Sequence, residues 1–202
     1  LFLNQYLASL SADRKALISR YQILDVARKV VGVGSVGTRC WILFMRGLNE
    51  GDPLFLQLKE AQPSVLAPYL DAPSFECQGS RVVCGQRLIQ GAPDILLGWG
   101  TVEGVQFYVR QLRDMKGSHE FDPKSWKRQG VIDYCALCGW ALALAHAKSG
   151  DAAMIAGYVG KSEALDDALT QFAIAYSEQN SRDYAELQKA VRIHRVKVAK
   201  VF

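Results

Sequence analysis

The chain has 202 residues, of which 50% are hydrophobic and 22% charged, a composition that suits one globular domain or two small lobes and excludes disorder. Its net charge of +4 comes without a dense run of lysine and arginine between aromatic residues, which argues against nucleic-acid binding. The longest apolar stretch, residues 138–147, is shorter than the about 20 residues that cross a membrane, so no membrane partner is expected.

The five cysteines are an odd number without the spacing of a disulfide framework, which favours a reducing, cytoplasmic location. The first fifteen residues lack the basic start and long apolar centre of a signal peptide. Because the chain opens on Leu1 rather than methionine, we expect it to be a fragment of a longer protein.

Strand patterns dominate the first half of the sequence. Ser11 precedes a short helical pattern, and residues 23–45 are rich in β-branched and aromatic residues on both sides of a group of glycines. The next segments in chain order are an alternating strand at 53–61, a helix at 78–94 that ends near Gly91, and a hairpin from 94–100 and 105–112. This half predicts a small antiparallel sheet with one helix.

The second half predicts helices. Asp122 can cap a helix that starts at Pro123 and runs through Ala147, apolar almost all round and therefore expected to be buried. Residues 162–176 place Leu165, Leu169, Phe172 and Tyr176 on one stripe, and residues 181–192 are also predicted to be helical. The sequence thus predicts an α+β fold with a sheet-rich lobe at 1–118 and a helical lobe at 119–202.

Gly32, Gly34 and Gly37 have the spacing G-x-G-x-x-G, which is typical of two kinds of phosphate site. A dinucleotide-binding turn needs a helix to begin within the motif, but residues 38–45 form a strand pattern. A turn between two strands, as in the flap that protein kinases place over a nucleotide, fits this context, and its glycines and Ser35 would present backbone amides to phosphates. A hairpin with glycines for tight packing remains the simpler alternative.

Lys59, near the end of the next strand, is the candidate partner for the phosphate charge. Strand alternation places it on one face with Gln57 and turns Glu60 to the other, so Glu60 is not expected to pair with it. Glu76 and Gln86 remain open as partners of the lysine. The strand at 105–112 and the segment after it would form a hinge beside the nucleotide, with Arg110 and Arg113.

Phosphoryl transfer also needs a catalytic aspartate, an asparagine five residues later and a second metal-binding aspartate. His146 and Asp151 superficially suggest such a loop, but the residue five positions after Asp151 is Ala156. We therefore interpret Asp151 as a helix cap and expect no catalytic residue and no metal ligand in this chain.

Cys135 and Cys138 form a C-x-x-C pair inside the apolar helical pattern. We expect buried thiols there, with a thiol redox protein as an alternative hypothesis, and no zinc site, because His146 adds only a third ligand. His119, His194 and the basic run at 192–200 are expected to lie on the surface.

Long blocks of the chain resemble one bacterial family, domain of unknown function 2252. The blocks are DVARKVVGVGSVGTRCW, LFLQLKEAQPSVL, GQRLIQGAPDILLGW, FYVRQLRDMKGS and LCGWALALAHAKSGD. The resemblance implies a protein-kinase-like fold related to aminoglycoside phosphotransferases. It also implies, upstream of this chain, a Gly-Asp-x-His-x-x-Asn loop and an Asp-Phe-Asp motif, so that the kinase halves are permuted and this chain is the C-terminal part.

From the residues and the resemblance together, we expect the nucleotide-binding part of an ATP-dependent phosphotransferase. Its partners would be ATP with Mg²⁺ and the upstream half of the same protein. The expected nucleotide contacts are Gly32, Gly34, Ser35, Gly37, Lys59, Arg110 and Arg113. A non-catalytic binding or regulatory module with the same fold is the alternative.

Overall fold

The computed structural model describes residues 2–32, 35–71, 74–112 and 127–198. The chain divides into two compact units, Leu1–Gly150 and Asp151–Phe202. The expected boundary between residues 118 and 119, and the helix cap expected at Asp122 and Pro123, lie outside the described residues.

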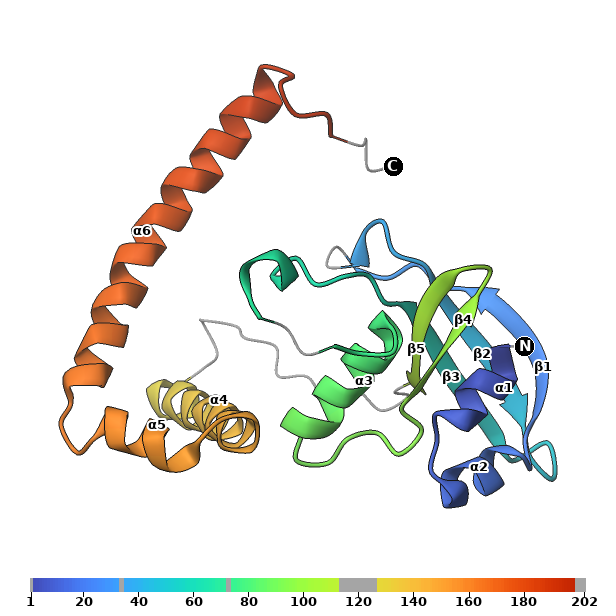
Figure 1. Cartoon of the computed structure of the whole chain (residues 1–202). Coiled ribbons are helices and arrows are strands. Elements are labelled where there is room, and N and C mark those ends of the chain that lie inside the picture. The colour runs from blue at the N-terminus through green and yellow to red at the C-terminus, as the bar shows by residue number, and fades with distance from the viewer. Residues whose placement is uncertain (1, 33–34, 72–73, 113–126, 199–202) are drawn as a thin grey trace. The chain divides into compact units, whose positions relative to one another are not determined.

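The first unit is built on a five-stranded antiparallel sheet, which confirms the expected α+β class (Figure 1). The spatial order of the strands is β1-β2-β3-β5-β4. Their bounds are β1 Gln22–Arg28, β2 Cys40–Arg46, β3 Pro53–Glu60, β4 Gly98–Val102 and β5 Val105–Gln111. The glycine turn joins β1 to β2, and the turn at Glu103 and Gly104, both with positive φ, joins β4 to β5.

One face of the sheet forms the hydrophobic core with two short helices, α1 (Phe2–Ala8) and α2 (Ala12–Ile18). Leu54, Leu56 and Leu58 of β3 point to this face, because alternate residues of a strand share a side. Tyr6 of α1 is fully buried among them, and its hydroxyl donates a hydrogen bond to the Leu96 carbonyl at 2.9 Å. Burial and the Asp94 carboxylate raise the pKa of this hydroxyl well above its usual range.

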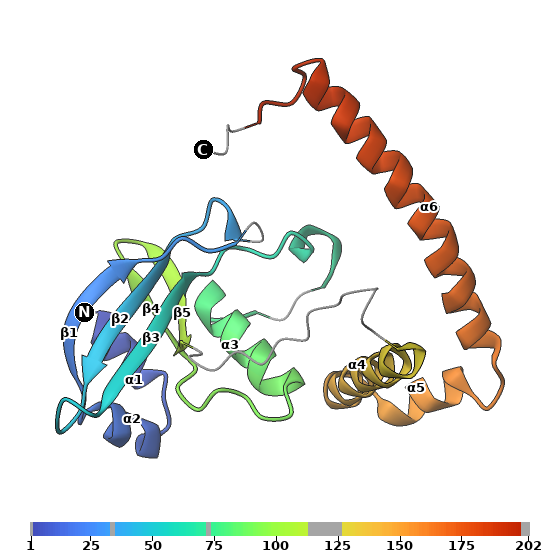
Figure 2. The ribbon, with the colours of Figure 1, turned by 180° about the vertical axis from the view of Figure 1, so that it is seen from behind.

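The other face of the sheet carries Trp99 and is packed by α3 (Gln78–Ile89), which lies on the side away from α1 and α2 (Figure 2). Cys77 caps this helix, because its sulfur accepts a hydrogen bond from the Ser80 amide while the Ser80 hydroxyl accepts one from the Cys77 amide. Near its start, Gly79 lies so close to the sheet that a Cβ there would be 2.5 Å from the Phe107 carbonyl oxygen. A short 3-10 turn, η2 (Ala67–Tyr69), precedes α3.

The remaining helix of the first unit, α4 (Arg128–Ser149), corrects the expectation of a buried helix. It packs against α3, and Lys148 Nζ donates to the Gln90 carbonyl at 2.9 Å. None of the residues of α4, all of them described, is buried, and the side chain of Trp140 is 64% exposed. An apolar circumference is buried only when neighbours surround it, and α3 covers just part of this helix.

By length and composition α4 is also apolar enough to cross a membrane, a test that core helices of soluble proteins pass as well. The uninterrupted apolar run at residues 138–147 is shorter than this helix, because polar residues interrupt the apolar ones elsewhere in α4. The absence of a membrane partner therefore stays a prediction.

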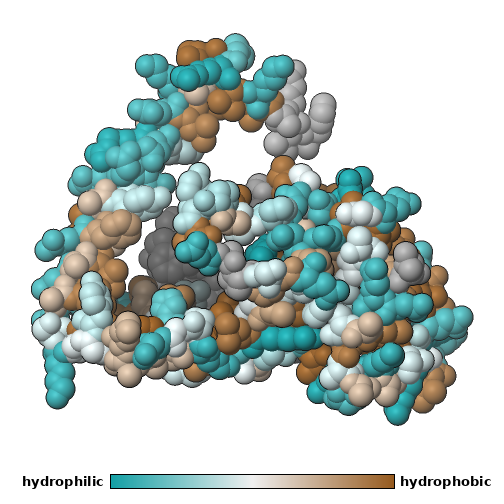
Figure 3. Space-filling view, viewed as in Figure 1, coloured by the Kyte–Doolittle hydropathy of each residue, from teal (hydrophilic) through white to brown (hydrophobic). Residues whose placement is uncertain are grey.

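The second unit consists of α5 (Ala152–Val159) and the long helix α6 (Ala164–Arg192), which unites the two helical segments expected at 162–176 and 181–192. Asp151 caps α5, since its Oδ1 accepts a hydrogen bond from the Met154 amide at 2.9 Å. This confirms the interpretation of Asp151 as a cap. Apolar side chains stand exposed along α6 (Figure 3).

Candidate phosphate-binding site

The glycine turn between β1 and β2 is closed by short-range hydrogen bonds. The Ser35 amide donates to the Gly32 carbonyl at 2.9 Å, and the Thr38 amide and hydroxyl both donate to the Ser35 carbonyl, at 3.1 and 2.7 Å. Gly37 has a φ of 82°, a backbone conformation that side chains disfavour and glycine adopts without strain. Gly34 lies outside the described residues. The turn therefore lies between two strands, as the sequence predicts.

Lys59 on β3 reaches this turn. Its Nζ donates a hydrogen bond to Ser35 Oγ at 3.1 Å, and the residue is partly buried. In the sheet register Lys59 lies opposite Cys40 on one side and Tyr108 on the other, so it points to the same face as α3. The structure thus joins two residues that the sequence analysis selected separately.

Glu60 points to the opposite face, as the alternation of β3 predicts. Its carboxylate accepts hydrogen bonds from the Arg39 amide at 3.0 Å and from Gln62 Nε2 at 3.1 Å, and the Arg39 guanidinium lies 3.9 Å away. The hydrogen bond from the Gln62 side chain lowers the pKa of Glu60 most, and the bond from the Arg39 amide lowers it further. Glu60 is held by these partners and does not pair with Lys59.

A second polar residue on the lysine face lies on β3 two residues before Lys59. Gln57 is only 4% exposed; its Oε1 accepts a hydrogen bond from Arg110 Nε at 3.1 Å, and its Nε2 donates to Cys40 Sγ at 3.4 Å. Arg110 is thereby fixed on the same face as Lys59, whereas Arg113 lies outside the described residues. Cys40, to which the sequence assigns no role, lies beside Lys59 because β2 pairs with β3.

The partner of Lys59 left open between Glu76 and Gln86 stays open. Glu76 is exposed just before α3, beside a cavity of about 360 Å³ that Trp99 and Thr101 also line. Gln86 lies on α3 itself. Within the described ranges, no carboxylate forms an ion pair with Lys59, and its hydrogen bond is to Ser35.

Sequence comparison places the chain in a family. The family model described as an uncharacterized protein conserved in bacteria, DUF2252, matches residues 1–190. The chain belongs to the DUF2252 family. No curated protein and no solved structure matches it.

The cysteine pair of this DUF2252 chain differs from expectation. Cys135 and Cys138 are both exposed, on the helix α4 that the sequence analysis expected to be buried. The expectation of buried thiols was wrong, because α4 is covered on one part of its circumference only. Among the described residues, no group of three histidines, cysteines or carboxylates could hold a metal ion.

The described histidines, His146 and His194, belong to no cluster that could hold a metal ion. His146 is exposed on α4, and His194 is exposed just after α6 with a φ of 58°. His119 lies outside the described residues.

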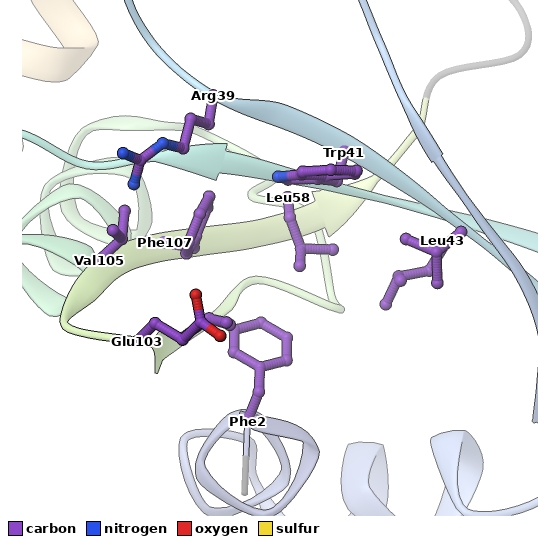
Figure 4. A pocket seen from close by; sticks show the side chains of 10 residues that line it. Phe2, Arg39, Trp41, Leu43, Leu58, Glu103, Val105 and Phe107 are labelled. Carbon is purple, nitrogen blue, oxygen red and sulfur yellow. The ribbon is translucent and has the colours of Figure 1, made fainter.

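The core face of the DUF2252 sheet holds a separate apolar cavity of about 550 Å³ (Figure 4). Phe2 of α1 points across it toward Phe107, with ring centroids 6.5 Å apart and the rings nearly perpendicular. Trp41 and Leu58 line another side, and Arg39 and Glu103 bring charge to its edge. Because Leu58 and Lys59 point to opposite faces, this cavity is not the site of the lysine.

Proposed function

We propose that the lysine face of the sheet, formed by Ser35, Gln57, Lys59 and Arg110, binds the phosphates of ATP. The observation that carries this proposal is the hydrogen bond from Lys59 Nζ to Ser35 Oγ at 3.1 Å. An ammonium group has three donors and no acceptor, so this bond leaves two donors for phosphate oxygens. The amides of the turn at Gly32, Gly34 and Gly37 would cover the same phosphates.

Charge supports an anionic ligand at this face. Arg110 is a second cation, and its Nε is held by Gln57, which leaves the other guanidinium donors available. An ammonium and a guanidinium on one sheet face, with no carboxylate paired to either in the described parts of the chain, suit a ligand with several negative charges. Arg113, outside the described residues, remains a predicted contact of the nucleotide.

The residues of the lysine face suit the phosphates of the nucleotide better than its Mg²⁺ ion. Mg²⁺ prefers carboxylate oxygens, and no suitable cluster lies within the described residues. The kinase-like family resemblance implies that the catalytic loop and the metal ligands lie upstream of Leu1. We propose on that basis that this chain contributes nucleotide binding to a cytoplasmic kinase-like phosphotransferase, and we assign no catalytic residue to it.

Thermal unfolding of the full-length protein with and without ATP and Mg²⁺ tests the proposal. Ligand at a hundredfold excess over its dissociation constant stabilises the folded state by about 2.7 kcal/mol, so a clear rise in Tm is expected. Lys59→Met should abolish the rise, and Lys15→Met, at an exposed lysine of α2, should preserve it. A rise that persists in Lys59→Met contradicts the site. No rise in the unaltered protein favours a binding or regulatory module.

A further inference from the structure

The long helix α6 carries an apolar strip along its length, which is exposed in its middle and half-buried at its two end residues, Leu165 and Val191. Its first half presents Leu165, Leu169, Phe172 and Tyr176, with Phe172 and Tyr176 stacked at a centroid distance of 5.6 Å. Phe172 is 63% exposed and Leu169 57% exposed. Residues three and four apart lie on one side of a helix, so these four form a continuous strip.

The second half of α6 continues the strip with Asn180, Tyr184, Leu187 and Val191. Tyr184 is 60% exposed and Leu187 51% exposed. The successive separations along the complete strip are four, three, four, four, four, three and four residues, a series that reads the same in both directions. An antiparallel copy of the helix therefore presents its own strip at matching positions.

The pairs that result are chemically compatible. With the twofold axis at residue 178, Leu165 faces Val191 of the other helix, Leu169 faces Leu187, and Phe172 faces Tyr184. The central pair is Tyr176 with Asn180, a hydroxyl with an amide that can hydrogen-bond to each other. A helix of 29 residues is about 43 Å long, so the contact would include several turns of each helix.

The charges on α6 favour the same direction of pairing. Its first turn is acidic, with Asp166 and Asp167, and its last turn is basic, with Lys189 and Arg192. An antiparallel pair places each acidic turn beside the basic turn of the other copy, whereas a parallel pair would align like charges. We propose that α6 is a homodimerisation helix that pairs antiparallel with α6 of a second copy of this chain.

The first test is the oligomeric state of the full chain, measured by sedimentation equilibrium from micromolar to submillimolar concentration. A dimer is expected. Phe172→Glu should raise its dissociation constant roughly a hundredfold, because two symmetry-related charges would have to be desolvated in the contact. Gln171→Glu adds the same charge on the opposite side of α6 and should leave the constant unchanged. A monomeric chain, or equal effects of the two substitutions, would overturn the proposal.

The second test addresses direction. Asp166→Lys together with Asp167→Lys should weaken an antiparallel dimer, and the further changes Lys189→Glu and Arg192→Glu should restore it. A parallel pair keeps like charges aligned in both variants, so unchanged dissociation constants in both would overturn the antiparallel arrangement. Far-UV circular dichroism verifies that each variant retains its helix content.

Discussion

Lys59 and Ser35 lie 24 residues apart in the sequence and are joined by a hydrogen bond of 3.1 Å from Nζ to Oγ. The bond connects the third strand to the glycine turn between the first two. It orients the ammonium along the turn, where backbone amides and the lysine can converge on one ligand. Its consequence for ligand binding can be measured at the turn.

Ser35→Ala should weaken ATP binding less than Lys59→Met does. The substitution removes the acceptor that orients Lys59 and keeps the cation itself. A hydrogen bond of this kind contributes about 0.5–1.5 kcal/mol, or roughly a two- to thirteenfold change in the dissociation constant. Isothermal titration calorimetry measures it. Ser19→Ala, at an exposed serine that follows α2, serves as the control. Equal affinities in Ser35→Ala and the unaltered protein would show that the bond does not position the lysine.

Two glycines of α3 should respond in opposite directions to alanine. At Gly79 the new Cβ would meet the Phe107 carbonyl oxygen at 2.5 Å and Trp99 Cβ at 2.8 Å, so Gly79→Ala should lower the free energy of unfolding by about 1–3 kcal/mol. A Cβ at Gly85 would have no atom from outside its own turn of helix within 4 Å in the described part of the chain. Gly85→Ala should therefore raise the free energy of unfolding by about 0.5–1 kcal/mol through helix propensity. Urea unfolding measures both. A loss of stability in Gly85→Ala would contradict the open surroundings described for that position.

Tyr6→Phe should destabilise the core although it removes a single oxygen. The Leu96 carbonyl would lose its partner in a buried environment, at a cost of about 1–3 kcal/mol. Chemical denaturation at neutral pH measures this cost. Leu3→Ala, at a partly exposed residue of the same helix, should cost less. A Tyr6→Phe protein as stable as the original would show that the carbonyl finds another donor.

Tyr6 should also make the stability of the folded chain depend on pH in the alkaline range. The folded-state pKa of Tyr6 is raised, so the folded chain holds its proton where the unfolded chain, with a tyrosine pKa of about 10, releases it. The stabilisation is therefore complete below pH of about 10 and is lost progressively above it. Denaturation curves from neutral to alkaline pH should show a smaller loss of stability in Tyr6→Phe than in the original protein. Parallel losses in both would contradict the assignment to Tyr6.

The cysteines should divide into two classes of reactivity. Cys84, Cys135 and Cys138 are exposed and should react with iodoacetamide in the folded protein, whereas Cys40 is 1% exposed and should react only on unfolding. Mass spectrometry of peptides after a short exposure distinguishes them. Protection of Cys135 and Cys138 in the folded protein would mean that a neighbour covers α4, as the apolar circumference of that helix led us to expect.

The sequence by itself determined those features that neighbouring residues encode. Alternation along β3 was sufficient to place Lys59 and Glu60 on opposite faces of the sheet. A carboxylate before a helical run was sufficient to identify Asp151 as a helix cap. The strand character after Gly37 was sufficient to exclude a dinucleotide turn. These properties depend on the backbone geometry of a few consecutive residues, which the side chains specify locally.

The tertiary structure decided what depends on residues distant in the chain. The pairing of β3 with β5, which brings Arg110 to Gln57, follows from a sheet register that no single segment encodes. The exposure of α4 could not be predicted from its apolar composition, because burial depends on how many neighbours pack around a helix. The composition of a helix or strand indicates which of its surfaces are apolar and favour burial. Only the arrangement of the helices and strands decides which of these apolar surfaces are covered.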